Sequence, residues 1–93
     1  MIFTVEIGNP ESFQDGAHRV AIYMDQERIS FLIKCLTRLA QGKPGDHVHF
    51  MTDSWTSEGD LSEVIFDESH VLTNHLEIIR VDDSTQHPEI GNE

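Results

Sequence analysis

The sequence contains few cysteines and few basic residues. Cys35 is the only cysteine among 93 residues, so the chain can form no intramolecular disulfide, and small exported domains usually carry several cysteines. Six Lys and Arg residues stand against 17 Asp and Glu residues, which gives a formal net charge of −11. This charge repels the phosphates of nucleic acids and of anionic membranes. We therefore expect no nucleic-acid and no membrane partner, and the charge favours a basic protein as partner.

Long apolar segments are also absent. No stretch approaches the ~20 apolar residues of a membrane span, and residues 1–6 lack the basic region and the apolar run of a signal peptide. These absences predict a cytoplasmic protein. The length is that of one domain. We predict that residues 1–82 form a single α+β domain and that residues 83–93 form a flexible acidic tail.

The sequence lacks the usual motifs of enzymes and cofactor-binding proteins. Its six glycines match neither a Walker A loop nor a dinucleotide-binding loop. Its loop serines show no nucleophile-elbow pattern, and Cys35 falls within a predicted helix, where a cysteine is more often a small buried hydrophobe than a thiolate. We therefore predict that the protein is not an enzyme and binds no cofactor.

The first half of the chain shows two strand patterns and one helical pattern. Apolar and polar residues alternate at 3–7 and at 20–24, which predicts two strands joined as a hairpin. Asp25 is a suitable N-cap for an amphipathic helix that runs to about Gln41. We expect the helix to end with Gly42 in the left-handed conformation.

The second half predicts further strands and, with them, the fold class. Alternation returns at 47–51 and 74–81, and residues 61–66 are predicted as a short strand. This order predicts an α+β fold, a two-layer sandwich in which one helix covers a four- or five-stranded, mainly antiparallel sheet in the order ββαββ. The other face of the sheet is then open to water or to a partner. The predicted core consists of Phe3, Val5, Ile7, Val20, Ile22, Leu32, Leu36, Leu39, Val48, Phe50, Leu76 and Ile78.

Four residues of two predicted strands form a candidate metal site. His47 and His49 are two positions apart, so they share one strand face at a spacing of roughly 6.5–7 Å. His75 and Glu77 share a face in the same way and would join them if the two strands pair. Three imidazoles and a carboxylate could bind zinc or another divalent transition metal, and an open position could activate water for hydrolysis. Surface histidines without a metal are the alternative interpretation.

The only tryptophan lies in a polar loop. Trp55 falls within residues 52–60, where it either folds back over the edge of the core or serves as an exposed anchor for a partner. An exposed ring among carboxylates would suit an Arg- or Lys-rich partner, through cation–π contacts and ion pairs. The predicted partner-binding site consists of Asp53, Trp55, Glu58 and Asp60.

The same region resembles a known family. Residues 45–55 read Gly-Asp-His-Val-His-Phe-Met-Thr-Asp-Ser-Trp, residues 61–63 read Leu-Ser-Glu, and residues 74–76 read Asn-His-Leu. These segments resemble small bacterial immunity proteins of polymorphic toxin systems, specifically the immunity protein 32 family, over about residues 45–80. The resemblance implies a non-enzymatic protein that binds and blocks a cognate toxin made by the same cell.

The sequence therefore predicts a small acidic binding protein, an immunity protein that neutralises a basic toxin. Two alternatives stay open. One is a metal-binding domain or hydrolase that uses the histidine cluster. The other is a structural homodimer, because the uncovered sheet face would present four side chains where a free surface is usually more polar: Tyr23, His49, Ile79 and Val81.

Overall fold

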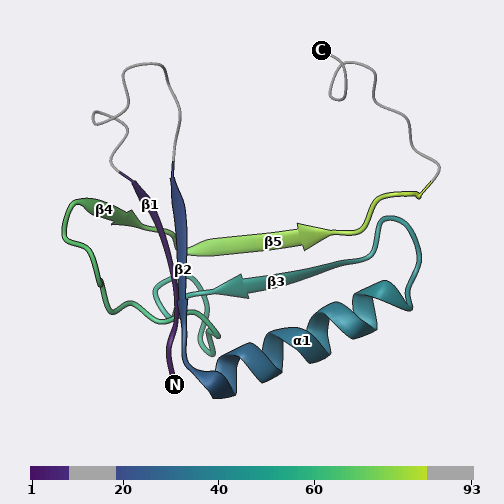
Figure 1. Ribbon diagram of the computed structural model, residues 1–93, viewed down its shortest axis with the longest axis horizontal. Helices are drawn as coiled ribbons and strands as arrows, with labels where there is room; N and C mark the ends of the chain where they lie inside the picture. Colours follow the sequence, from purple (N-terminus) through teal and green to yellow (C-terminus); the bar gives the residue numbers. More distant parts are fainter. Residues whose placement is uncertain (9–18, 84–93) are drawn as a thin grey trace, which may run out of the picture.

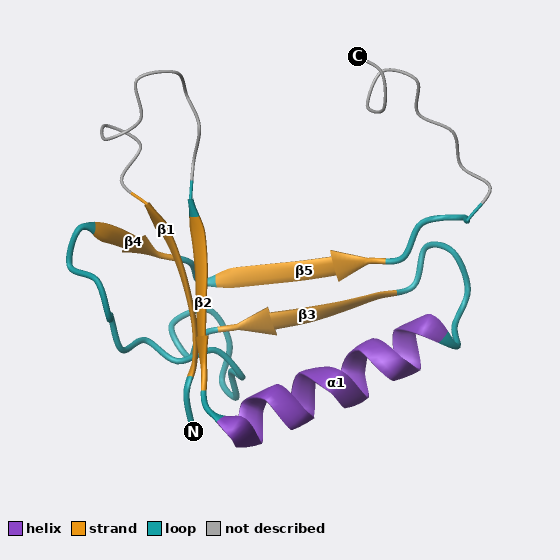
Figure 2. Cartoon of the chain, in the orientation of Figure 1, coloured by secondary structure: helices purple, strands orange, loops and turns teal. Residues whose placement is uncertain are grey.

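Two antiparallel sheets and one helix make up the part of the chain that the computed structural model describes, residues 1–8 and 19–83 (Figures 1 and 2). The predicted tail beyond Asp83 and the connection between the first two strands lie outside the described residues. The elements are β1 (Phe3–Gly8), β2 (Val20–Met24), α1 (Gln26–Ala40), β3 (His47–Met51), β4 (His70–Leu72) and β5 (His75–Ile79). The predicted α+β class is confirmed. Three strands follow the helix, where the expected order ββαββ has two.

The five strands form two sheets where the sequence predicted one. The first sheet has the order β2-β1-β4 and the second consists of β3 and β5. Thr73 and Asn74 connect β4 to β5 and bond to both sheets: the Thr73 amide donates to the Val5 carbonyl at 2.8 Å, and the Thr52 amide donates to the Asn74 carbonyl at 3.0 Å. The two sheets are therefore held together at this short connection.

Helix α1 begins as the sequence predicts. The Asp25 carboxylate accepts the Arg28 amide at 2.9 Å as an N-cap, and its second oxygen accepts the Ile2 amide at 2.9 Å. These bonds hold the pKa of Asp25 below its ordinary value, the Arg28 amide contributing most and burial opposing the shift. One carboxylate thus fixes both the helix start and the chain terminus.

The end of α1 differs from the prediction. Gln41 forms the C-cap, and Gly45 (φ +95°), rather than Gly42, is the glycine in the left-handed region. The Arg80 guanidinium donates to the carbonyls of Ala40 at 3.1 Å and Gly42 at 2.6 Å. The last helical carbonyls are therefore satisfied by a side chain that follows β5, so a left-handed residue directly after the helix is not needed.

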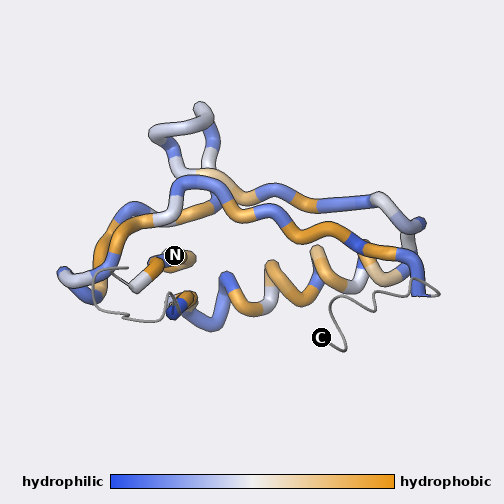
Figure 3. Tube along the Cα trace, turned by 90° about the horizontal axis from the view of Figure 1, so that it is seen from above, coloured by the Kyte–Doolittle hydropathy of each residue, from blue (hydrophilic) through white to orange (hydrophobic). Residues whose placement is uncertain are grey.

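The core lies between α1 and the strands. Seen from above, the helix runs along one side of the strand layer (Figure 3). The rings of Phe3 and Phe31 lie against Phe50, with centroids 5.2 and 5.9 Å from it. Each fully buried phenylalanine contributes about 1.5–3 kcal/mol. The buried apolar residues are Phe3, Val5, Cys35, Leu39, Phe50 and Leu61.

Part of the predicted core is wrong. Val20 and Ile22 are 60% and 48% exposed, because α1 starts directly after β2 and packs beside the Met24 end of that strand. Leu36 is exposed as well. The helix buries Cys35 and Leu39 and partly buries Phe31 and Leu32. Its outward stripe is also apolar and faces solvent; it consists of Ile29, Ile33 and Leu36.

The predicted strand at 61–66 is also wrong. Leu61 makes a single bridge to Thr52, and the short strand of this region is β4 instead. Residues 62–69 cross the face of β1 that points away from the core, beginning at a Ser62 amide that donates to the Phe3 carbonyl at 2.6 Å. Consequently Thr4 and Glu6 are fully buried. Among the described strands, the expected open face on the side away from the helix is therefore found only at β3 and β5.

Candidate functional site

The open face of β3 and β5 carries the predicted histidine cluster. The antiparallel register places His49 opposite Glu77, Met51 opposite His75 and His47 opposite Ile79. Odd-numbered residues of both strands share this face, and the even-numbered ones, among them the buried Phe50, point to the core. The structure thus brings together all four residues of the candidate metal site.

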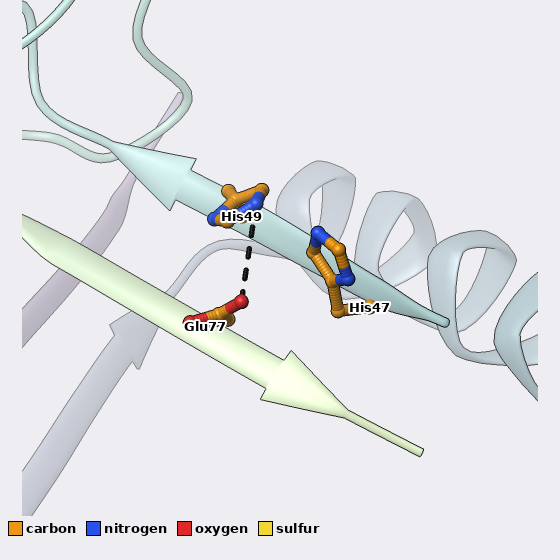
Figure 4. Close-up of side chains that lie close together, drawn as sticks. All are labelled: His47, His49 and Glu77. Carbon is orange, nitrogen blue, oxygen red and sulfur yellow. Dashed lines mark ion pairs between the residues drawn. The ribbon is translucent and has the colours of Figure 1, made fainter. Parts of the chain in front are cut away.

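The cluster is closely spaced. The His49 Nε2 atom lies 3.9 Å from Glu77 Oε2, and the His47 and His49 rings meet edge to face with centroids 4.6 Å apart (Figure 4). On its other side, His49 Nδ1 lies 3.0 Å from His75 Nε2. His49 is therefore the centre of the cluster, with the carboxylate near one ring nitrogen and a second imidazole at the other.

The loop 52–60 follows β3 and has a fixed backbone. Its turn is closed by the Trp55 and Thr56 amides, which donate to the Thr52 carbonyl at 2.9 and 3.1 Å. The Asp53 carboxylate accepts the Gly59 amide at 2.8 Å. A Cβ at Gly59 would lie 2.3 Å from the Met51 carbonyl oxygen, so the two arms of the loop approach as closely as only glycine permits.

Glu63, in the segment that follows the loop, binds the loop by two hydrogen bonds. Glu63 accepts both the hydroxyl and the amide of Ser54, at 2.6 and 2.9 Å. These two bonds, the hydroxyl first, hold the pKa of Glu63 below its ordinary value, against a smaller effect of burial. No local pattern in the sequence indicates this role of Glu63, because its nearness to Ser54 depends on the path of the chain after the loop.

Trp55 is an exposed residue of this loop. Its side chain is 60% exposed, and its ring centroid lies 6.1 Å from that of His75. Of the two interpretations of this residue, the structure shows the exposed one. The predicted partner-binding loop and the histidine cluster therefore adjoin one another on the same side of the molecule.

The three acidic residues of the predicted partner site do not converge on Trp55. The Asp53 carboxylate turns toward Gly59, and Asp60 pairs with Arg28 at 3.7 Å. Glu58 is exposed and makes no hydrogen bond or ion pair with any residue that the structure describes. Of the four predicted residues, Trp55 and Glu58 are thus the two whose side chains remain available to a partner.

A buried carboxylate and its histidine partner have no counterpart among the residues that the sequence singled out. Glu6 Oε1 and His70 Nδ1 lie 2.9 Å apart, and His70 Nε2 lies 3.3 Å from Asp67. The Phe66 amide donates to Glu6 Oε2 at 2.6 Å. Burial raises the pKa of Glu6, but the bonds from Phe66 and His70 outweigh it and hold the pKa below its ordinary value. The alternation of β1 placed Glu6 on a solvent face, so no local signal marked it.

The surface proposed for a homodimer is smaller than expected. Tyr23 stacks on Phe66 with centroids 4.5 Å apart, because residues 62–69 cover that part of the sheet. His49, Ile79 and Val81 remain exposed. A second copy of the chain stays a prediction, now limited to the face of β3 and β5.

Comparison with known proteins identifies no relative. No protein-family model, no curated protein and no solved structure matches the chain. The likeness to immunity proteins therefore rests on the sequence segments quoted above. Among the described residues, 1–8 and 19–83, no helix is long and apolar enough to cross a membrane.

Proposed function

We propose that this chain is a small acidic binding protein that binds and neutralises a basic protein toxin, with Trp55 as the anchor of its binding surface. The observation that carries the proposal is the exposure of Trp55 on a loop with a fixed backbone. A tryptophan is highly buried in most proteins, and an exposed one is the side chain most enriched at binding hot spots.

The rigidity of the loop supports a binding role. Five hydrogen bonds restrain it before any partner arrives: one each from Trp55, Thr56 and Gly59, and two from Ser54. Ordering a flexible loop would oppose binding, and a preformed one avoids that loss. The loop also projects from the strand layer on the side opposite α1 (Figure 3), where a partner can approach it.

The charge of the chain supports a basic partner. A formal net charge of −11 attracts cationic proteins and accelerates their association at low salt. Glu58 makes no hydrogen bond or ion pair with a residue of 1–8 or 19–83, so it can pair with an arginine or lysine beside the Trp55 ring. The carboxylates of Asp53 and Asp60 already bind groups of the same chain. We therefore assign them to the shape of the loop and to its negative electrostatic field, and not to direct ion pairs with the partner.

The choice of a toxin as the partner follows from the resemblance of residues 45–80 to immunity proteins. Proteins of that kind bind without catalysis, in agreement with the absence of enzyme motifs from the sequence. An inhibitor of a basic toxin can place carboxylates where the toxin would bind phosphates.

Co-expression tests this function. The chain is produced together with each protein encoded beside its own gene, and growth rescue and co-purification are measured. We expect one neighbour to be toxic alone, tolerated with the wild-type chain, and tolerated less with Trp55→Ala. Ser57→Ala, an exposed change in the same loop, is the matched control. If no neighbour is toxic, or none is neutralised or co-purified, the proposal is wrong.

A further inference from the structure

We infer that the open face of β3 and β5 is a binding site for a divalent transition-metal ion, with His47, His49 and Glu77 as its ligands (Figure 4). This site adjoins the partner-binding surface, but its ligands are other residues and the inference does not depend on the proposed function. All three side chains come from neighbouring positions of two paired strands, so their backbones are fixed by the sheet.

The distances are close to those of a metal site. One potential ligand atom from each of the three residues lies within 4.8 Å of the other two. Around a tetrahedral zinc ion with bonds of about 2.0–2.1 Å, ligand atoms are about 3.3 Å apart. The ligand atoms must therefore approach one another by up to about 1.5 Å. Because the three side chains are exposed, rotations about their χ angles can bring the atoms together without any change in the core.

Hydrogen bonds prepare the histidines for coordination. His47 Nδ1 lies 3.3 Å from the Gly45 carbonyl, which can only accept, so the neutral ring carries its proton on Nδ1 and a lone pair on Nε2. When His49 Nδ1 donates to His75 Nε2 at 3.0 Å, the His49 Nε2 lone pair faces Glu77. Both rings can then present Nε2 to one ion.

His75 becomes a positioning residue in this arrangement. Its Nε2 atom accepts the hydrogen bond from His49 Nδ1–H, and this bond fixes the tautomer of His49. Ligand histidines in metal sites usually donate their second N–H to such a partner. The site therefore has three protein ligands, where the sequence suggested four.

The ligand set selects the class of metal. Two imidazoles and one carboxylate suit zinc and its first-row neighbours, whereas calcium and magnesium prefer oxygen ligands. The net charge of −11 raises the local concentration of any cation. Because the ligands are exposed, further coordination positions are open to water or to a ligand from a partner.

Titration of zinc into tag-free protein tests the site. Calorimetry should show one equivalent of Zn²⁺ bound, with affinity reduced at least 100-fold in His49→Ala and strongly in His47→Ala and Glu77→Gln. His75→Ala should lose about 10- to 100-fold, the range for a residue that supports a ligand. The double variant His18→Ala/His87→Ala, at the two histidines outside the described residues, is the matched control and should bind as the wild type does.

A second readout uses the single tryptophan. Cu²⁺ bound at the cluster should quench the fluorescence of Trp55, whose ring lies 6.1 Å from His75, and the quenching should saturate at one equivalent. Circular dichroism of each variant checks the fold. Absence of zinc binding at micromolar concentration in the wild type would overturn the inference. So would wild-type affinity in the folded variants Glu77→Gln and His49→Ala, or loss of binding in the control.

Discussion

Glu6 and His70 form a hydrogen-bonded pair inside the protein: Oε1 and Nδ1 lie 2.9 Å apart, and the two side chains are 0% and 4% exposed. Residues from β1 and β4 supply the pair, and the Phe66 amide completes it from the segment that crosses the sheet. A charge buried in this way is stable only while its partners are present. The pair therefore fastens residues 62–69 to the first sheet.

Glu6→Gln should destabilise the protein by about 1–3 kcal/mol, because it removes a charge-assisted bond and leaves His70 with a weaker acceptor. Urea denaturation measures the change. Glu68→Gln, an exposed acid of the same segment, is the control and should change stability by less than about 0.5 kcal/mol. Equal stability of the two variants would show that the pair does not hold the segment.

Stability should also depend on pH through Glu6. Its pKa in the folded state is below the ordinary 4.5, so its contribution is fully present above that pH and is lost as the pH falls through the folded pKa. The difference in unfolding free energy between wild type and Glu6→Gln should therefore shrink as the pH is lowered from 6 toward 3. A difference that grows in acid would contradict this assignment.

Gly59→Ala should disturb the Trp55 loop. The added Cβ would lie 2.3 Å from the Met51 carbonyl oxygen and 2.8 Å from the Asp53 nitrogen, both backbone atoms that cannot move aside easily. We expect a loss of about 1–3 kcal/mol and a shift in Trp55 fluorescence. Gly45→Ala is the comparison: it strains a backbone with φ +95° but meets no atom within 4 Å, so the fluorescence should not change.

Phe50→Ala should cost about 3–5 kcal/mol, because this ring joins Phe3 of β1 and Phe31 of α1 in the core. Ile33→Ala removes a side chain of the outward helix stripe and should change stability by less than about 0.5 kcal/mol. Thermal or urea unfolding compares the two. Similar losses would mean that the outward stripe of α1 is covered.

The sequence predicts strand and helix positions well where one physical signal decides them. The period-two alternation of β3 and β5 placed His49 and Glu77 on one face, and the pairing of those strands then brought them together. Asp25 marked the start of α1 by its capping chemistry alone.

Other features depend on which segment covers a sheet face. The alternation of apolar and polar residues does not predict this. The alternation of β1 predicts that Glu6 faces solvent, but residues 62–69 cover it in the structure. The alternation of β2 predicts Val20 and Ile22 as core residues, but α1 does not extend over them. The role of Glu63 in holding Ser54 likewise follows from the path of the chain after the loop. These are tertiary facts with no local pattern in the sequence.

The most direct test of the proposed function measures the affinity of the Trp55 loop for the neutralised partner. Once co-expression identifies that partner, calorimetry compares wild type, Trp55→Ala and Ser57→Ala. We predict that Trp55→Ala loses at least about 2 kcal/mol, or roughly 30-fold in Kd, while Ser57→Ala changes little. Binding of Trp55→Ala with the affinity of the wild type would contradict the proposal that this exposed ring anchors the partner.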